Sequence, residues 1–369
     1  MHANVGNESR EANTPRPIFW KIFLGGIVLA SVIVWVASVL DLERVWRTLE
    51  RVNVPLALLS ILPVIASHWM RALRWRTMLR SVPDMPSIRM RDLFSAVMVG
   101  YTANNIIPRS GEVIRPYVLA RRVGTPTSVV FASVIAERAV DVLQLIIFFA
   151  LGFLLLPNLH TQVLPQWVVN QAGRLLALVA LAIVIAVVVI GLTSIGERAI
   201  LWCVRLFKPL VAERIQRMFQ SFRRGLRIIR HAGDAIRILV ESLLIWVLYA
   251  LPLWIVLLAV PMTVPEGVQW TFWDACVILL VVAVGTTIAP TPGAIGVVHA
   301  LVAEAMKSLY RVPIEEAFVF ITIAHALNYG SVMLVGGLCV AREGISLTTV
   351  LRSPNLSGTE LSAMPQTDA

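Results

Sequence analysis

The chain has few charged side chains for its length and only three cysteines. Just 15% of its 369 residues are Asp, Glu, Lys or Arg, whereas 57% are hydrophobic. A mean hydropathy of +0.78 lies outside the range of soluble domains. The composition therefore predicts an all-α polytopic integral membrane protein.

The scarcity of cysteine also restricts the chemistry. Cys203, Cys276 and Cys339 are far apart and have neither metal-ligand spacing nor the pattern of a disulfide framework. We therefore expect no metal site and no thiol redox chemistry. The sequence also has no nucleotide-binding loop, so we expect no cofactor. The expected sources of energy are an ion gradient, the membrane potential or the lipid gradient.

The formal net charge of +10 does not indicate nucleic-acid binding, because most basic residues lie in short segments between apolar runs. Arginine is concentrated in 71–91 and 195–237, which are predicted to be cytoplasmic. Segments 157–173 and 261–273 contain no Lys or Arg and are predicted to lie outside. Both termini are then cytoplasmic, in a multi-pass protein of the cell membrane.

The apolar runs define the predicted membrane domain, residues 18–342, between disordered tails at 1–17 and 343–369. A helix needs about 20 apolar residues to cross the hydrocarbon core. Candidate spans lie near 18–40, 54–70, 174–194, 238–260 and 314–341, and a longer run at 128–156 carries internal charges. The run at 54–70 is short, and its flanking arginines are expected to snorkel to the membrane surface.

Two further apolar stretches, 92–122 and 274–308, are interrupted by proline and glycine. These residue types end one helix and allow another to begin. Because the loop charges place both ends of each stretch on one side of the membrane, each is predicted to be a re-entrant helical hairpin. The two hairpins are expected to enter from opposite faces.

The two breaks resemble each other. Ile106-x-Pro108-x-x-Gly111 aligns with Ile288-x-Pro290-x-x-Gly293 at an offset of 182 residues, and a similar offset relates the other spans in pairs. This predicts an inverted repeat of halves 18–156 and 174–341, each with three spans and one hairpin. Inverted repeats with broken helices are typical of secondary transporters.

Charges within the 128–156 run mark the first candidate site, because an ionised group inside a span is expensive. Glu137 and Asp141 share a helix face, and Arg138 and Asp141 are spaced to form an ion pair. The alternative interpretation is an internal ion pair that only fixes this helix to the first hairpin.

The first hairpin offers partners for these charges in Arg109, Glu112 and Arg115. Arg109 lies where the returning helix begins, and a helix N-terminus together with a guanidinium favours phosphate. Alternatively, Arg109 snorkels to the cytoplasmic surface. The second hairpin is polar but poor in charge, and His299 and His325 are interpreted as hydrogen-bonded packing residues.

The predicted substrate-binding residues come from both hairpins and the charged helix, and no catalytic residue is predicted. They are Asn105, Arg109, Glu112, Arg115, Glu137, Arg138, Asp141, Thr291, Pro292 and Gly293. Segment 195–237 alternates arginine with apolar residues, as amphipathic helices on the inner leaflet do. It is equally consistent with an orientation signal alone.

Four motifs together resemble the transmembrane domain of lysylphosphatidylglycerol synthases, a flippase-like family, over residues 18–342. They are Ser67-His68-x-x-Arg71-Ala72-Leu73-Arg74-Trp75-Arg76, Asn105-x-x-Pro108-x-x-Gly111-Glu112-x-x-Arg115, Glu137-Arg138-x-x-Asp141 and Pro290-Thr291-Pro292-Gly293-Ala294-Ile295-Gly296. Thr291 and Ala294 depart from the Ser-Pro-Gly-Gly run of many relatives. The resemblance implies paired re-entrant helices and lipid translocation, without the soluble synthase domain.

The leading hypothesis is a translocator, rather than an enzyme, for a membrane phospholipid or lipid-linked head group. Arg109 and Arg115 would hold the phosphate, and Glu112, Glu137 and Asp141 would balance the charge. Two alternatives remain open, a membrane enzyme acting on phospholipid or polyprenyl-phosphate substrates, and an accessory subunit of a separate synthase or glycosyltransferase. A homo-oligomer is also left open.

Overall fold

The structure is a computed structural model of the chain. The described residues are 38–80, 82, 85–155, 232–266, 269–289 and 291–344, with single positions at 27, 30, 31, 34 and 178. The predicted span at 174–194, most of the one at 18–40, both predicted tails apart from 343 and 344, and most of segment 195–237 lie outside the described residues. All the elements within the described residues are helical.

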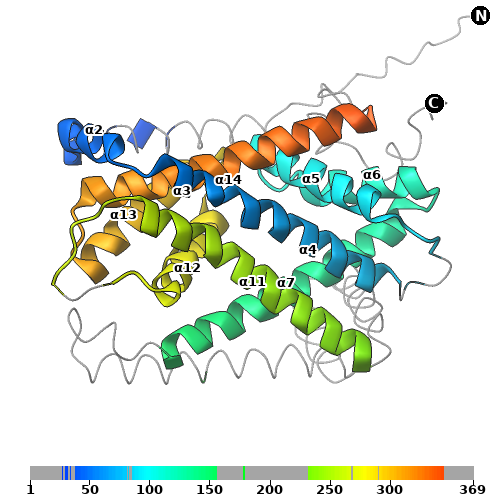
Figure 1. Cartoon of the computed structure of the whole chain (residues 1–369). Helices are drawn as coiled ribbons and strands as arrows, with labels where there is room; N and C mark the ends of the chain where they lie inside the picture. Colours follow the sequence, from blue (N-terminus) through cyan, green and yellow to red (C-terminus); the bar gives the residue numbers. More distant parts are fainter. Residues whose placement is uncertain are drawn as a thin grey trace, which may run out of the picture.

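Eleven elements follow one another in the described part of the chain (Figure 1). They are α2 (Leu42–Glu50), α3 (Val54–Leu59), α4 (Ile61–Leu79), α5 (Met90–Ile106), α6 (Gly111–Val123), α7 (Thr127–Leu155), α11 (Ala232–Ala259), α12 (Phe272–Ile288), the 3-10 turn η1 (Pro292–Ala294), α13 (Val297–Tyr310) and α14 (Ile314–Glu343). Most helix ends lie within a few residues of the predicted boundaries.

Three of these segments are long and apolar enough to cross a membrane. They are Val54–Leu79, which combines α3 and α4, Gly233–Ala259 and Ile314–Glu343. Helices α4 and α11 pack along each other, and in Figure 1 they lie between the α5–α6 pair and the α12–α13 pair. Helix α4 ends at Leu79, well past the predicted end of this span at residue 70.

The surface segment 41–53, which carries balanced charges, forms the short helix α2. The Asp41 carboxylate accepts hydrogen bonds from the backbone N–H groups of Glu43 and Arg44 and so caps the helix N-terminus. The side chain of Trp46 is 64% exposed on this helix. An exposed tryptophan among charges is typical of a helix at a membrane interface.

The first helical hairpin, α5–α6, turns at the predicted break. Ile107 has an extended backbone with φ −126° and ψ 116°, the conformation that a following proline favours. The Asn104 side chain then accepts the Gly111 N–H at 2.7 Å. A Cβ atom at Gly111 would overlap the backbone of Gly100, so glycine is required for α6 to fold back against α5.

The second hairpin, α12–η1–α13, also turns at an extended residue that precedes a proline. Ala289, which precedes a proline in the sequence, has φ −65° and ψ 125°. Gly293 and Gly296 then take left-handed conformations, with φ of 60° and 88°. The Thr291 hydroxyl donates to the Ile295 carbonyl at 2.9 Å and closes the turn.

The long helix α14 contacts both hairpins. It packs on α5 so closely that a Cβ atom at Gly336 would overlap the Thr102 hydroxyl. Near its middle, the ring of Tyr329 lies against Gly293 of the second break. The Tyr329 hydroxyl donates to the Asn105 carbonyl of the first break at 3.4 Å. Helix α5 also contacts η1 directly, so the two breaks are neighbours in space.

Candidate functional site

The charged group on α7 is the centre of a buried cluster. The carboxylate of Glu137 has no exposed surface and forms an ion pair with Arg115 of α6. The guanidinium of Arg115 also lies 3.9 Å from the ring centre of Trp75, in a cation–π arrangement. The structure therefore joins two predicted site residues from different motifs, Arg115 and Glu137.

Helix α4 supplies two further arginines that the sequence analysis assigned to a cytoplasmic loop. Arg71 contacts Glu137 at 2.7 Å and Asp141 at 3.0 Å. Arg74 contacts Glu137 at 3.2 Å and also pairs with Asp141. Their exposed fractions are 4% and 0%. The expectation that these arginines snorkel to the membrane surface is wrong, because α4 continues and two acids on α7 neutralise them.

Helix α11 closes the cluster with neutral polar groups. Arg71 donates to the Tyr249 hydroxyl at 3.0 Å, and Arg74 donates to the Ser242 hydroxyl at 3.0 Å. The spacing of seven residues between Ser242 and Tyr249 places both on one helix face. Gln144 on α7 accepts a further bond from Arg74 at 3.2 Å.

The sequence did contain a signal for the two missed arginines. Arg71 and Arg74 are three residues apart and follow the apolar run directly, and the sequence has no proline or glycine between Val64 and Leu79. This spacing puts both on one face of a continuing helix. A loop assignment rested only on the number of arginines, which does not distinguish a buried arginine from one at the surface.

Arg138 and Glu112 form the accessible rim of the cluster. Arg138 lies 3.4 Å from Glu112 of α6 and 3.3 Å from Asp141. The side chains of Arg138 and Glu112 are 37% and 43% exposed. The predicted pairing of Arg138 with Asp141 is confirmed, whereas Glu112 pairs across helices with Arg138. Arg109, with φ 67°, is exposed at the turn before α6.

The buried part of the cluster has more positive than negative charge. Three arginines, Arg71, Arg74 and Arg115, face the two carboxylates of Glu137 and Asp141. The buried Nε atoms of these arginines and of Arg138 have no hydrogen-bond partner. A buried donor without an acceptor is unfavourable. The arrangement therefore suits an additional anion.

The predicted site residues of the second hairpin adjoin the first break. Thr291 is buried and bonds to the Ile295 carbonyl, and Gly293 packs against Tyr329. Tyr329 in turn reaches Asn105. Thr291, Pro292 and Gly293 thus form the turn beside Asn105, while Arg115, Glu137 and Asp141 form the ion-paired cluster.

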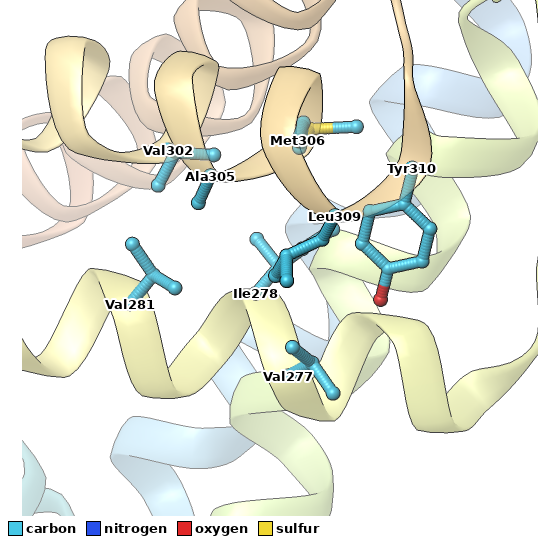
Figure 2. A pocket seen from close by; sticks show the side chains of 8 residues that line it. All are labelled: Val277, Ile278, Val281, Val302, Ala305, Met306, Leu309 and Tyr310. Atoms are coloured by element: carbon cyan, nitrogen blue, oxygen red, sulfur yellow. The ribbon is translucent and has the colours of Figure 1, made fainter. Parts of the chain in front are cut away.

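An apolar crevice lies between α12 and α13, away from these charges. Figure 2 shows its lining side chains, which are Val277, Ile278, Val281, Val302, Ala305, Met306, Leu309 and Tyr310. Its empty volume is about 180 Å³, part of it open to the outside. Within the described part of the chain, no three His, Cys, Asp or Glu side chains are placed to hold a metal ion.

The family follows from a comparison with known protein families. Residues 22–336 match the family model of the lysylphosphatidylglycerol synthase TM region. The chain belongs to this family. The match covers both hairpins and the whole charged cluster, so it confirms the resemblance seen in the sequence motifs, and it makes the chain a membrane protein.

Archaeal membrane proteins are among the curated proteins that are similar in sequence to this chain. The chain is 27% identical to a UPF0104 membrane protein of Pyrococcus horikoshii over 50% of this chain and 54% of the relative. It is 26% identical to a UPF0104 membrane protein of Methanothermobacter thermautotrophicus over 56% of this chain and 59% of the relative. The matches thus span about half the length of each relative.

Proposed function

We propose that this protein moves a lipid with a phosphate-bearing head group between the leaflets of the membrane. The observation that carries the proposal is the excess of buried arginine over carboxylate, together with the four buried Nε donors that lack acceptors. Arginine binds phosphate through two parallel hydrogen bonds. A phospholipid or lipid-linked head group would supply the missing acceptors.

The exposed rim suggests how a head group enters. Arg138 and Glu112 are the accessible charged pair, and Arg138 also contacts Asp141. A phosphate that displaced Glu112 from Arg138 would next meet Asp141 and the buried arginines behind it. A phosphate that replaced Glu112 at Arg138 would keep that guanidinium paired and would bring a further negative charge to the cluster.

An inverted repeat with re-entrant hairpins is part of the proposal. Helices α5 and α12 have 17 residues each, α6 and α13 have 13 and 14, and α7 and α14 have 29 and 30, in the same order. Each hairpin turns next to a proline, and its second helix packs against its first. The contact of α5 with η1 supports a shared site between the breaks.

A second charged cluster supports the proposed orientation, with both termini in the cytoplasm. Asp92 at the start of α5 contacts Arg342 near the end of α14 at 3.1 Å. Arg122 near the end of α6 contacts both Asp92 and Glu343, at 3.7 Å each. Three helix ends therefore share one arginine-rich side, as cytoplasmic ends do.

Lipid movement in proteoliposomes tests the function. We expect purified protein to move fluorescent phospholipids or a polyprenyl-phosphate sugar to the opposite leaflet, followed by chemical quenching of the outer leaflet. Arg138→Gln removes a cation from the accessible rim and leaves no fully buried group without a partner. We expect this variant to slow transport at least about tenfold, because losing one hydrogen bond to a charged group has an effect of that size.

The matched control is Arg47→Gln. Arg47 forms an ion pair with Glu43 on the exposed surface of α2, and both side chains are about 70% exposed. We expect normal transport by this variant. Unchanged transport by Arg138→Gln, or no movement of any lipid by well-folded wild-type protein, would contradict the proposed function and favour an enzyme or an accessory subunit.

A further inference from the structure

Two histidines from different helices face each other beside the second break. The ring centroids of His299 on α13 and His325 on α14 are 4.9 Å apart, with an interplanar angle of 32°. His299 also contacts Phe318, and His325 lies against Tyr329 with 27° between their rings. Both imidazoles are partly buried. This pair is separate from the arginine cluster.

His299 holds the start of α13 in place. Its Nδ1 atom accepts the backbone N–H of Gly296 at 3.3 Å, so the neutral ring carries its proton on Nε2. Gly296 has φ 88° and precedes the first residue of α13. A proton on Nδ1 would abolish this acceptor and oppose two N–H groups. Protonation of His299 is therefore coupled to the geometry of the second turn.

Tyr329 connects the pair with both breaks. Its ring stacks on His325, and a Cβ atom at Gly293 would lie 2.6 Å from it. Its hydroxyl reaches the Asn105 carbonyl at 3.4 Å. A change of charge or position at His325 thus acts directly on the residue that bridges the two turns.

Charged groups also lie on the elements that pack against the pair. Asp274 lies at the start of α12, far along the chain from its break, and accepts bonds from Thr271. Asp92 lies at the corresponding end of α5 and is paired with arginines. Other ionisable side chains on α13, α14 and the helices that contact them are Glu304, Lys307, Tyr310, Glu315, Glu316, Cys339, Arg342, Glu343, Arg91, Tyr101, Cys276, Glu43, Arg44, Arg47, Glu50, His68, Arg71, Arg74, Arg76, Asp234, Arg237, Glu241 and Tyr249.

We propose that His299 and His325 form a binding site for one proton, and that this proton is the coupling ion of transport. The proposal rests on the proposed lipid translocation. The proton comes from the aqueous phase, binds an imidazole nitrogen, and is released when the turn returns to the neutral geometry. Two imidazolium ions at this separation repel each other, so the pair takes up a single proton.

Histidine NMR tests the proton site without any transport. The chain has six histidines, and ring labelling of the protein in nanodiscs resolves their tautomers as the pH is changed. We expect the His299 and His325 signals to titrate together, with one proton taken up by the pair. In His299→Gln, the His325 signal should titrate as an isolated histidine, and the reverse should hold for His325→Gln. Two independent titrations, unaffected by removal of the other ring, would overturn the proposal.

Transport under a pH gradient tests the coupling. A gradient of about one pH unit biases a one-proton step by up to about tenfold. We expect wild-type protein to respond to the gradient with an increased net flux of lipid, and His299→Gln and His325→Gln to lose this response while still moving lipid without a gradient. His160→Gln is the control, because this histidine belongs to neither hairpin segment of the sequence, and it should keep the response.

The outcomes separate the two proposals. Lipid movement that ignores the pH gradient would overturn the coupling and leave the translocator function intact. Absence of lipid movement would contradict the proposed function, and the NMR titration would then decide alone whether the pair binds a proton. Loss of the gradient response in the control variant as well would assign the effect to another group and reject the histidine pair.

Discussion

The α5–α6 and α12–α13 hairpins use the same backbone device for different chemistry. Each ends its first helix at a residue that precedes a proline, and each then turns through residues with positive φ. The first hairpin places Arg115 in an ion-paired cluster, whereas the second has glycines, Thr291 and His299, which faces His325 of α14. The backbone turns of the two hairpins are therefore similar, whereas the side chains that follow the turns differ in charge.

The two halves therefore rely on different interactions. The charges on α6 and α7 are buried in ion pairs, so removing one of them leaves its partners uncompensated. The second hairpin holds its turn with neutral hydrogen bonds and close packing against Tyr329. We therefore expect substitutions to affect the first half through charge balance and the second through conformation.

Removing the central carboxylate should give the largest effect. Glu137→Ala leaves Arg71 and Arg74 with Asp141 alone and removes the carboxylate that pairs with Arg115, and breaking a buried ion pair costs about 3 to 5 kcal/mol. We expect a much lower midpoint of thermal unfolding in detergent. Glu43→Ala, in the exposed pair on α2, should change stability by less than about 1 kcal/mol. Similar stability of the two variants would show that the cluster is not electrostatically essential.

An intermediate effect is expected when the close approach in the first hairpin is blocked. Gly111→Ala places a methyl group in the backbone of Gly100, and overpacking of this kind costs about 1 to 3 kcal/mol or more. Gly124→Ala is the matched control, because Gly124 has φ 68° and nothing within 4 Å of its added Cβ atom. Thermal unfolding should rank Gly111→Ala as the more damaging change. The reverse order would mean that α6 does not pack on α5 in this way.

The smallest effect is expected for the contact between the two breaks. Tyr329→Phe removes one hydrogen bond to the Asn105 carbonyl and keeps the ring on Gly293, so stability should fall by about 1 kcal/mol. Hydrogen exchange at the N–H groups around Asn105 should rise in this variant. Unchanged exchange would show that the ring alone joins the hairpins.

Much of the helical framework could be predicted because its signals are local. The break after Ile106 follows from Pro108, which holds Ile107 in an extended conformation. The bounds of α7 and α14 follow from long apolar runs, and the Arg138–Asp141 pair follows from their spacing within one helix. The inverted arrangement of the halves and the role of the site residues in substrate binding stay predictions.

The partners of the buried arginines could not be predicted in the same way. Arg71 and Arg74 belong to a stretch that is rich in arginine, and the distribution of charge along a chain favours a cytoplasmic loop for such a stretch. Their partner Glu137 is more than 60 residues away in the sequence. By contrast, the pairing of Glu112 with Arg138 agrees with the prediction that the first hairpin supplies partners for the charges on α7.

The sequence by itself determined the membrane class, the family motifs, the two broken helices and the charged face of α7. Each of these depends on composition or on residues within a few turns of one helix. Only the tertiary structure decided which arginines neutralise Glu137, that Tyr329 joins the two breaks, and that His299 faces His325. These contacts join distant segments, and their formation depends on how α4, α6, α7, α11, α13 and α14 pack, which local propensity does not specify.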